Sequence, residues 1–516
     1  MPITVRVFAP RWYVSRTIVP ELRVTFLTML AVLGSFGTAL VIEHFAGLHV
    51  DVVILAVVLA MTLSRATGQG KDHDPRNPLL SLVLLPLVSV AALEVGSLLR
   101  DHETLGDAVI VLAFSGAIWV RRFGPLATRA GTIATLPFLA ALITPAPVPV
   151  HDSRWWAGVI ALVAAGWVTA TQQLGRRIGW WTPPEDIAPL PGIQRRPSAG
   201  LPASTKMALQ LAAALSAGFA LGHLTFGRHW TWVVVTVYVV CAGNRGRADV
   251  LHRSVLRVAG ATVGTATATL IAGAVAPGSR LAIVAIFGVL AVGTWLRTYN
   301  YAFWAMCMTA ALALLYGYFG ESGGHILGLR MLAILLGAAL GVASSWLLLP
   351  VRTHDVLRRR VADALAALTD VLQALRGNPD AVSSSAAGFH TAVRALDQIA
   401  PPLLLSRRLS RGPHAADAIE GIRHCAAPVT ALEQYARENP EHLQSKPATG
   451  HAGLVLREIV DVRRALAGQP RPTRDRPRRD VSDDPLHGSL DAIAVALDTV
   501  HQAMSLPGRP RRQPAS

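Results

Sequence analysis

Apolar stretches close to the length of a membrane-spanning helix alternate with short polar loops over residues 24–349. A helix needs about 20 apolar residues to cross the hydrocarbon core of a bilayer. The pattern therefore predicts spans at about 24–44, 48–64, 79–99, 105–120, 130–146, 156–173, 205–224, 229–243, 256–276, 281–296, 301–319 and 328–349. We expect an all-α, polytopic membrane protein with about twelve transmembrane helices and the lipid bilayer as its surroundings.

Polar segments divide the chain into regions. Residues 1–23 form a polar leader, and residues 176–204 contain the stretch TPPEDIAPLPGIQRRP, whose proline density is typical of an extended connector. From residue 351 onwards, apolar residues recur at helical spacing opposite a charged face, and no stretch is apolar enough to span a membrane. We predict membrane repeats at 24–175 and 205–350 and a cytosolic helical domain at 351–516 with disordered basic segments.

The two predicted membrane regions resemble one another. FAGLH before the second span corresponds to FGRH before the eighth, and IWVRRF at the end of the fourth corresponds to TWLRTY at the end of the tenth. Arg65 corresponds to Arg245 at an offset of 180 residues. Each repeat has an even number of spans, so the two six-helix repeats enter the membrane in the same direction, related by an axis along the membrane normal.

The charge of the loops predicts the orientation. The chain carries a formal net charge of +16, yet only 16% of its residues are charged, against about 25% in an average soluble domain. Twenty Arg and Lys fall in segments on the side of the N-terminus and five on the other. The positive-inside rule then places both termini in the cytoplasm, in the cell (inner) membrane, and accounts for the charge without a nucleic-acid partner.

The shorter second and eighth spans, at corresponding positions of the two repeats, are the best sequence indication of a binding site. Arginines at the ends of the ninth, tenth and twelfth spans are able to bind a carboxylate bidentately, with positive-inside anchoring as the alternative for all but Arg330. Nearby tryptophans belong either to an interfacial belt or to a stacking surface for a flat ligand. The candidate substrate-binding residues are Arg253, Arg257, Arg297, Arg330, Trp230, Trp232 and Trp295.

Ionisable residues inside a membrane are candidate proton carriers because burying each of them costs several kcal/mol without a partner or cavity. Glu94 and Asp51 are the candidates, with an interfacial position as the alternative for Asp51 and for Asp107. Glycines at four-residue spacing predict close helix packing at Gly260, Gly264, Gly337 and Gly341. The chain has no phosphate-binding loop, no HExxH and no GxSxG, so we expect no enzyme activity, no cofactor and no metal.

The hairpin RHWTWVVVTVYVV followed by RSVLRVAGATVG, and the closing segment GLRMLAILLGAALGVASSWLLLP, resemble the fusaric acid resistance protein-like (FUSC) family. The resemblance covers roughly residues 205–350, and the first repeat is a diverged copy without the arginine–glycine signature. It implies an inner-membrane exporter of aromatic carboxylic acids, driven by the proton gradient. An organic-anion channel gated by the tail and a non-transporting scaffold are the alternatives. The sequence leaves open whether the protein forms a homo-oligomer and whether it needs an adaptor protein.

Overall fold

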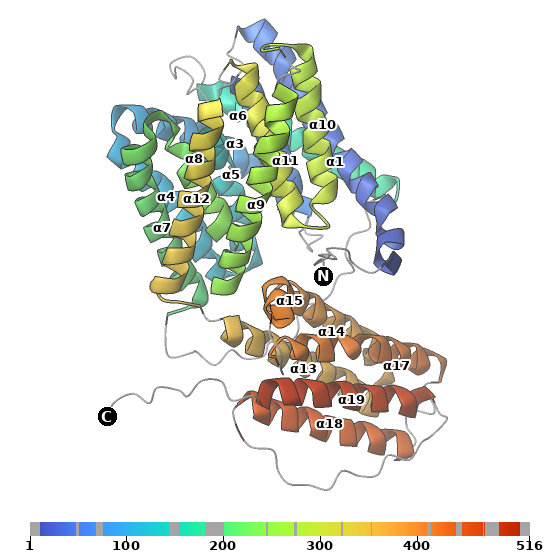
Figure 1. Cartoon of the computed structure of the whole chain (residues 1–516). Coiled ribbons are helices and arrows are strands. Elements are labelled where there is room, and N and C mark those ends of the chain that lie inside the picture. The colour runs from blue at the N-terminus through green and yellow to red at the C-terminus, as the bar shows by residue number, and fades with distance from the viewer. Residues whose placement is uncertain are drawn as a thin grey trace, which may run out of the picture. The chain divides into compact units, whose positions relative to one another are not determined.

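The computed structural model describes residues 11–47, 51–68, 76–143, 154–180, 201–243, 246–272, 276–320, 324–351, 353–409, 414–439, 446–467, 469 and 485–505. These residues form helices and turns, with no strand among them (Figure 1). They divide into two compact units, the first within residues 1–350 and the second from Val351 onwards together with the start of the ninth helix up to Asp249. The predicted all-α class is confirmed.

The first unit contains the helices that Figure 1 colours from blue to yellow. They are α1 (Arg11–Ala46), α2 (Asp51–Gly68), α3 (Arg76–Asp101), α4 (Glu103–Trp119), η1 (Val120–Phe123), α5 (Pro125–Ile143), α6 (Arg154–Arg177), α7 (Ala203–Phe226), η2 (Gly227–His229), α8 (Thr231–Cys241), α9 (Arg247–Ala272), α10 (Arg280–Leu296), α11 (Tyr301–Tyr318) and α12 (Gly324–Leu347).

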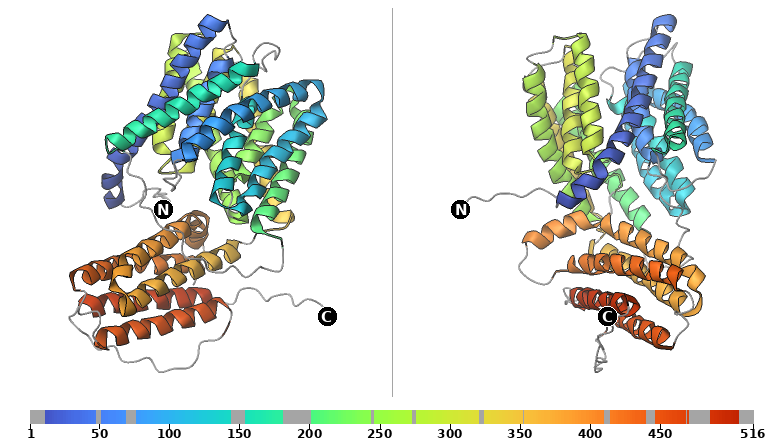
Figure 2. Two further views of the ribbon diagram at one scale, coloured as in Figure 1. Left: turned by 180° about the vertical axis from the view of Figure 1, so that it is seen from behind. Right: turned by 90° about the vertical axis from the view of Figure 1, so that its right-hand side faces the viewer.

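The second unit contains the remaining helices of the described chain. They are α13 (Thr353–Gly377), η3 (Pro379–Ala381), α14 (Val382–Asp397), α15 (Ala400–Leu409), α16 (Asp417–His424), α17 (Ala426–Glu438), α18 (Lys446–Leu466) and α19 (Pro485–Ser505). Figure 2 shows α18 and α19 side by side. Their apolar faces enclose one core, in which Leu357, Phe389, Leu432 and Leu497 are fully buried.

Eight of the described helices are long and apolar enough to cross a membrane, namely α1, α3, α4, α5, α6, α7, α11 and α12. Three apolar helices are shorter: α2, α8 and α10. The 11 residues of α8 span roughly 16 Å at the helical rise of 1.5 Å per residue. In α9 the basic first half lowers the hydropathy. Length and composition alone thus support eight spans rather than the twelve expected.

Several helix boundaries differ from the sequence expectation. The first helix begins at Arg11, inside the predicted leader, and α9 begins at Arg247 rather than near residue 256. Arg253 and Arg257 consequently lie well inside a helix. The proline-rich stretch from 182 to 197 and the basic segments predicted to be disordered lie outside the described residues.

The same combinations of helices pack together in both halves of the first unit. In the first half, α1, α2 and α6 contact one another and α4 contacts α5. In the second half, α7, α8 and α12 contact one another and α10 contacts α11, a pair visible in Figure 2. Contacts between the halves are reciprocal as well, because α4 packs on α7 and α1 packs on α10.

Glycines allow α9 to pack closely on α11, and α12 to pack closely on α8. A Cβ added at Gly260 would lie 2.5 Å from the carbonyl oxygen of Ala302, and one at Gly264 would clash with the backbone of Met306. On α12, a Cβ at Gly337 would lie 2.8 Å from Cβ of Thr236, and one at Gly341 would lie 3.1 Å from Sγ of Cys241. A larger residue would separate α9 from α11 or α12 from α8.

Candidate functional site

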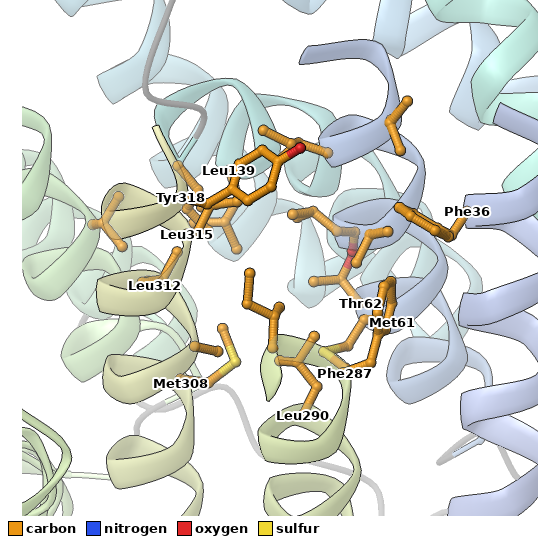
Figure 3. Close-up of a pocket in the computed structure, with 18 of the residues that line it drawn as sticks. Phe36, Met61, Thr62, Leu139, Phe287, Leu290, Met308, Leu312, Leu315 and Tyr318 are labelled. Atoms are coloured by element: carbon orange, nitrogen blue, oxygen red, sulfur yellow. The ribbon is translucent and has the colours of Figure 1, made fainter. Parts of the chain in front are cut away.

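A cavity of about 240 Å³ lies between the two halves of the first unit. Its walls come from α1, α2 and α5 of the first half and from α8, α9, α10 and α11 of the second. Figure 3 shows Met308, Leu312 and Leu315 of α11 on one side and Phe36 and Met61 of α1 and α2 on the other. The short helices α2, α8 and α10 all line it, and the sequence predicts a binding site at the first two.

Arg65 lies at the end of α2 and is one of two charged residues in the cavity wall. Its guanidinium carbon is 3.3 Å from the centroid of a ring of Trp304, on α11. Its Nε and Nη2 atoms are buried and have no hydrogen-bond partner among the described residues. Stacking engages the face of a guanidinium and leaves its in-plane N–H groups directed elsewhere. Arg65 is thus a cation fixed by stacking on Trp304, and two of its nitrogens have hydrogen-bond donors without a partner among the described residues.

Arg257, in the first half of α9, is the other charged residue in the wall. Its side chain is only 6% exposed, and its buried Nε has no hydrogen-bond partner among the described residues. Arg253, one turn earlier, is used differently. Its Nη1 and Nη2 donate to the carbonyl oxygens of Ala242 at 3.1 Å and Gly243 at 3.3 Å, just beyond the end of α8. The structure therefore separates the two arginines into a helix-capping group and a cavity group.

Arg330 on α12 is 4% exposed and lies outside the cavity wall. Its guanidinium carbon is 5.8 Å from a ring of Trp232 and 5.9 Å from the ring of Tyr316. The Nε1 of Trp232 donates to Oη of Tyr316 at 3.0 Å, which holds the two rings at right angles. Arg330 is close enough to Arg257 for their charges to interact. Arg330 is thus a third buried cation, which lies beside the cavity wall near Arg257.

The remaining predicted substrate-binding residues are dispersed. Arg297, at the end of α10, interacts electrostatically with Glu21 and Arg65. Trp230 packs on Phe219 and His223 of α7. Trp295 packs on Tyr299, with its indole N–H buried. None of these three lines the cavity, so Arg257 is the one predicted substrate-binding residue that does.

Of the two predicted proton carriers, Glu94 is exposed on α3 and does not line the cavity. Asp51 is the first residue of α2, and its side chain lies outside the described residues. Asp107, for which the sequence predicts an interfacial position, forms a pair with His223, with 3.1 Å between Oδ2 and Nε2. This pair joins α4 to α7 and so bridges the two halves. The sequence contained both residues but no signal that would bring them together.

Arg65 and Trp304 are the site residues that sequence reasoning missed. In the sequence, Arg65 is a loop charge that marks the repeat, and Trp304 is an aromatic residue of the kind that is typical of a membrane interface. The one available signal was the position of Arg65 at the end of the short second span. Their contact depends on α2 and α11 facing each other across the cavity, which no local pattern reveals.

The electrostatics of the site favour an anion. Arg65, Arg257 and Arg330 form no ion pair with a carboxylate of any described residue. An uncompensated charge in a membrane interior costs several kcal/mol, which an anion bound nearby would offset. The rest of the wall is almost wholly apolar. Two guanidinium groups in such a wall suit the binding of an organic anion. No cluster of metal-ligating side chains occurs among the described residues.

Comparisons with known proteins are informative for one region. Residues 211–344 match the sequence pattern of the family described as fusaric acid resistance protein-like. The chain matches no curated protein and no solved structure. The matched region covers α8–α11 and most of α7 and α12, and it includes Arg257 and Trp304. This chain is therefore similar to the fusaric acid resistance protein-like family over residues 211–344, and its long apolar helices are those of a multi-pass membrane protein.

Proposed function

We propose that this protein exports small organic carboxylate anions, aromatic ones among them, across the inner membrane, and that the proton gradient drives the export. The observation that carries the proposal is the pair Arg65 and Arg257 in the wall of an apolar cavity, each with at least one buried nitrogen that has no hydrogen-bond partner among the described residues. A carboxylate matches the planar fork of an arginine and neutralises it, and an apolar body matches the wall.

The membrane arrangement that goes with this proposal has twelve spans in two parallel six-helix repeats, both termini in the cytoplasm and a cytosolic C-terminal domain. The recurring helix combinations in the two halves and the excess of positive charge in the loops support it. Helices α2, α8 and α10 are then short spans that line the cavity. Bilayer thinning or burial within the bundle accommodates such spans at a modest cost.

The cavity gives this export a physical mechanism. Because both halves contribute to its wall, a change in their packing would open it to one side of the membrane and then to the other. Arg257 and Arg65 exchange the hydration of a carboxylate for charge-assisted hydrogen bonds, and Arg330 adds a positive field behind them. For the proton we keep Glu94 and Asp51 as candidates and add the Asp107–His223 pair, which joins the halves.

The test is efflux of a labelled aromatic carboxylate from proteoliposomes that contain the full chain. Arg257→Gln and Arg65→Gln should each lower efflux by about tenfold or more, since a hydrogen bond to a charged group contributes roughly 1.5–3 kcal/mol. Arg280→Gln, an exposed arginine at the start of α10, is the matched control and should leave efflux unchanged. An uncoupler should abolish export. Normal efflux from well-inserted Arg257→Gln protein would overturn the proposed role, and uncoupler-insensitive current would indicate a channel.

A further inference from the structure

The wall of the cavity extends along most of the length of α2 and of α11. Along α2 its wall runs from Arg65 to Val53, a distance of roughly 18 Å at 1.5 Å per residue. Along α11 it runs from Trp304 to Phe319. Its basic end is defined here by Arg65, Arg257 and Trp304, and its apolar end by Val53, Ile283, Leu315 and Phe319. A compact aromatic acid bound at the basic end would leave the apolar end unfilled.

The wall between the two ends offers almost no hydrogen-bonding group. Thr62 is the polar side chain there, and its Oγ1 already donates to the carbonyl oxygen of Val58 in the same helix at 2.6 Å. The phenol of Tyr318 lies beyond it, toward the apolar end (Figure 3). A hydroxyl in the middle of a ligand would therefore lose its water without gaining a partner.

We infer that the cavity is built for an amphiphilic anion, a single carboxylate on an elongated, unsubstituted hydrocarbon body such as a medium-length alkyl chain. This inference rests on the proposed function for the site but narrows the substrate class. The carboxylate binds Arg65 and Arg257, and the body extends past Met61, Leu290 and Leu312 to the apolar end. Hydroxylated aromatic acids are the poorer ligands, because their ring hydroxyls meet an apolar wall.

The selectivity that follows has a definite size. Each methylene transferred from water to an apolar wall gains about 0.8 kcal/mol, so each added carbon should raise affinity about threefold to fourfold until the cavity is full. A mid-chain hydroxyl should lower affinity by about tenfold or more, the effect of a buried polar group without a partner. Loss of the negative charge should lower it by a comparable factor.

The experiment is photo-crosslinking of a diazirine-bearing alkyl carboxylate to the full chain in liposomes, with the modified peptides mapped by mass spectrometry. Crosslinks should fall on α2, α10 and α11. From hexanoate to decanoate, each added carbon should improve competition about threefold to fourfold. Decanoate should also compete better than its methyl ester, mid-chain hydroxydecanoate and hydroxybenzoate. Equal competition by the methyl ester, or by a decyl chain with a phosphocholine head, would overturn the inference in favour of a lipid chain.

Two variants make the result specific to the cavity. Leu315→Trp should remove the gain from longer chains because it fills the apolar end, whereas Leu335→Trp, on the exposed face of α12, should not. A chain-length gain that survives Leu315→Trp would overturn the inference. Export of benzoate without decanoate binding would leave the proposed function intact and refute the elongated ligand. Decanoate binding without export of any carboxylate would do the reverse.

Discussion

Arginines are used in opposite ways in the two units. In the second unit they pair with carboxylates at the surface: Nε of Arg423 lies 2.7 Å from Oδ1 of Asp397, and Nε of Arg407 lies 2.6 Å from Oδ1 of Asp417. In the first unit, Arg257 and Arg330 are 6% and 4% exposed and form no ion pair with a described carboxylate.

This difference separates charges that stabilise a fold from charges that, in our proposal, are held for a ligand. An exposed ion pair contributes about 0–1 kcal/mol and could be lost without great harm. A buried, unpaired guanidinium opposes folding instead, so its presence needs a compensating function. In the second unit the apolar core provides the stability. In the first unit, part of the stability that apolar packing provides offsets the cost of burying the cations.

The largest effect expected is on the packing of the first unit. Gly264→Leu should abolish folded protein, because even a Cβ there clashes with the backbone of Met306 and separates α9 from α11. Gly288→Leu on α10, where an added Cβ meets nothing within 4 Å, is the control. The amount of monodisperse protein extracted from membranes measures both. A well-folded Gly264→Leu variant would show that α9 is free to move away from α11.

A smaller packing effect is expected in the second unit. A Cβ at Gly421 would lie 2.6 Å from Cγ2 of Val500, so Gly421→Leu should destabilise this unit by about 1–3 kcal/mol through overpacking. Gly488→Leu, in open space on α19, should have little effect. Labelling of Cys425 reports the unfolding, since burial raises the pKa of this thiol to about 12 and it reacts only when the unit opens. Unchanged labelling of Gly421→Leu would contradict the packing.

The charge comparison can be tested directly by removing one arginine from each unit. Arg257→Met should leave the thermal stability of the first unit unchanged or raise it, because an unpaired buried charge is removed. Arg423→Met should lower the stability of the second unit by up to about 1 kcal/mol. The measurement is thermal unfolding of the full chain by proteolysis and mass spectrometry, which reports the unfolding of each unit separately through its own peptides. Equal destabilisation by both substitutions would mean that Arg257 holds the fold together.

The smallest effect expected is the pH dependence of Asp417. Burial alone would raise the pKa of its carboxyl, but the backbone N–H of His414 and the guanidinium of Arg407 outweigh burial and hold the pKa below its ordinary value. A lowered pKa stabilises the fold above the unfolded value of about 3.9 and loses this contribution as pH falls through the folded value.

Asp417→Asn should accordingly destabilise the second unit by less than about 1 kcal/mol at neutral pH, since the pair is partly exposed. The difference from the wild type should shrink in acid. Denaturant unfolding of both proteins across the acidic range measures it. A difference that stays constant with pH would assign the loss to the changed side chain rather than to its charge.

Much of this protein is determined by its sequence alone. Hydrophobic length predicts the helices of the first unit, and amphipathic spacing from Val351 onwards predicts a separate helical unit. These features are local, since the solvent or lipid that each face meets is recorded in the order of residues along one helix. The same reasoning selected Arg257 and the glycines of α9 and α12 as residues of interest.

Only the tertiary structure decided which of these residues meet. Arg253 and Arg257 share a helical face in sequence, yet one caps α8 and the other faces the cavity. Arg65 is a site residue because α2 and α11 face each other across the cavity and Trp304 stacks on its guanidinium. Helical periodicity predicts which face of a helix is covered but not which helix covers it. That choice depends on how all side chains fit together in the packed bundle.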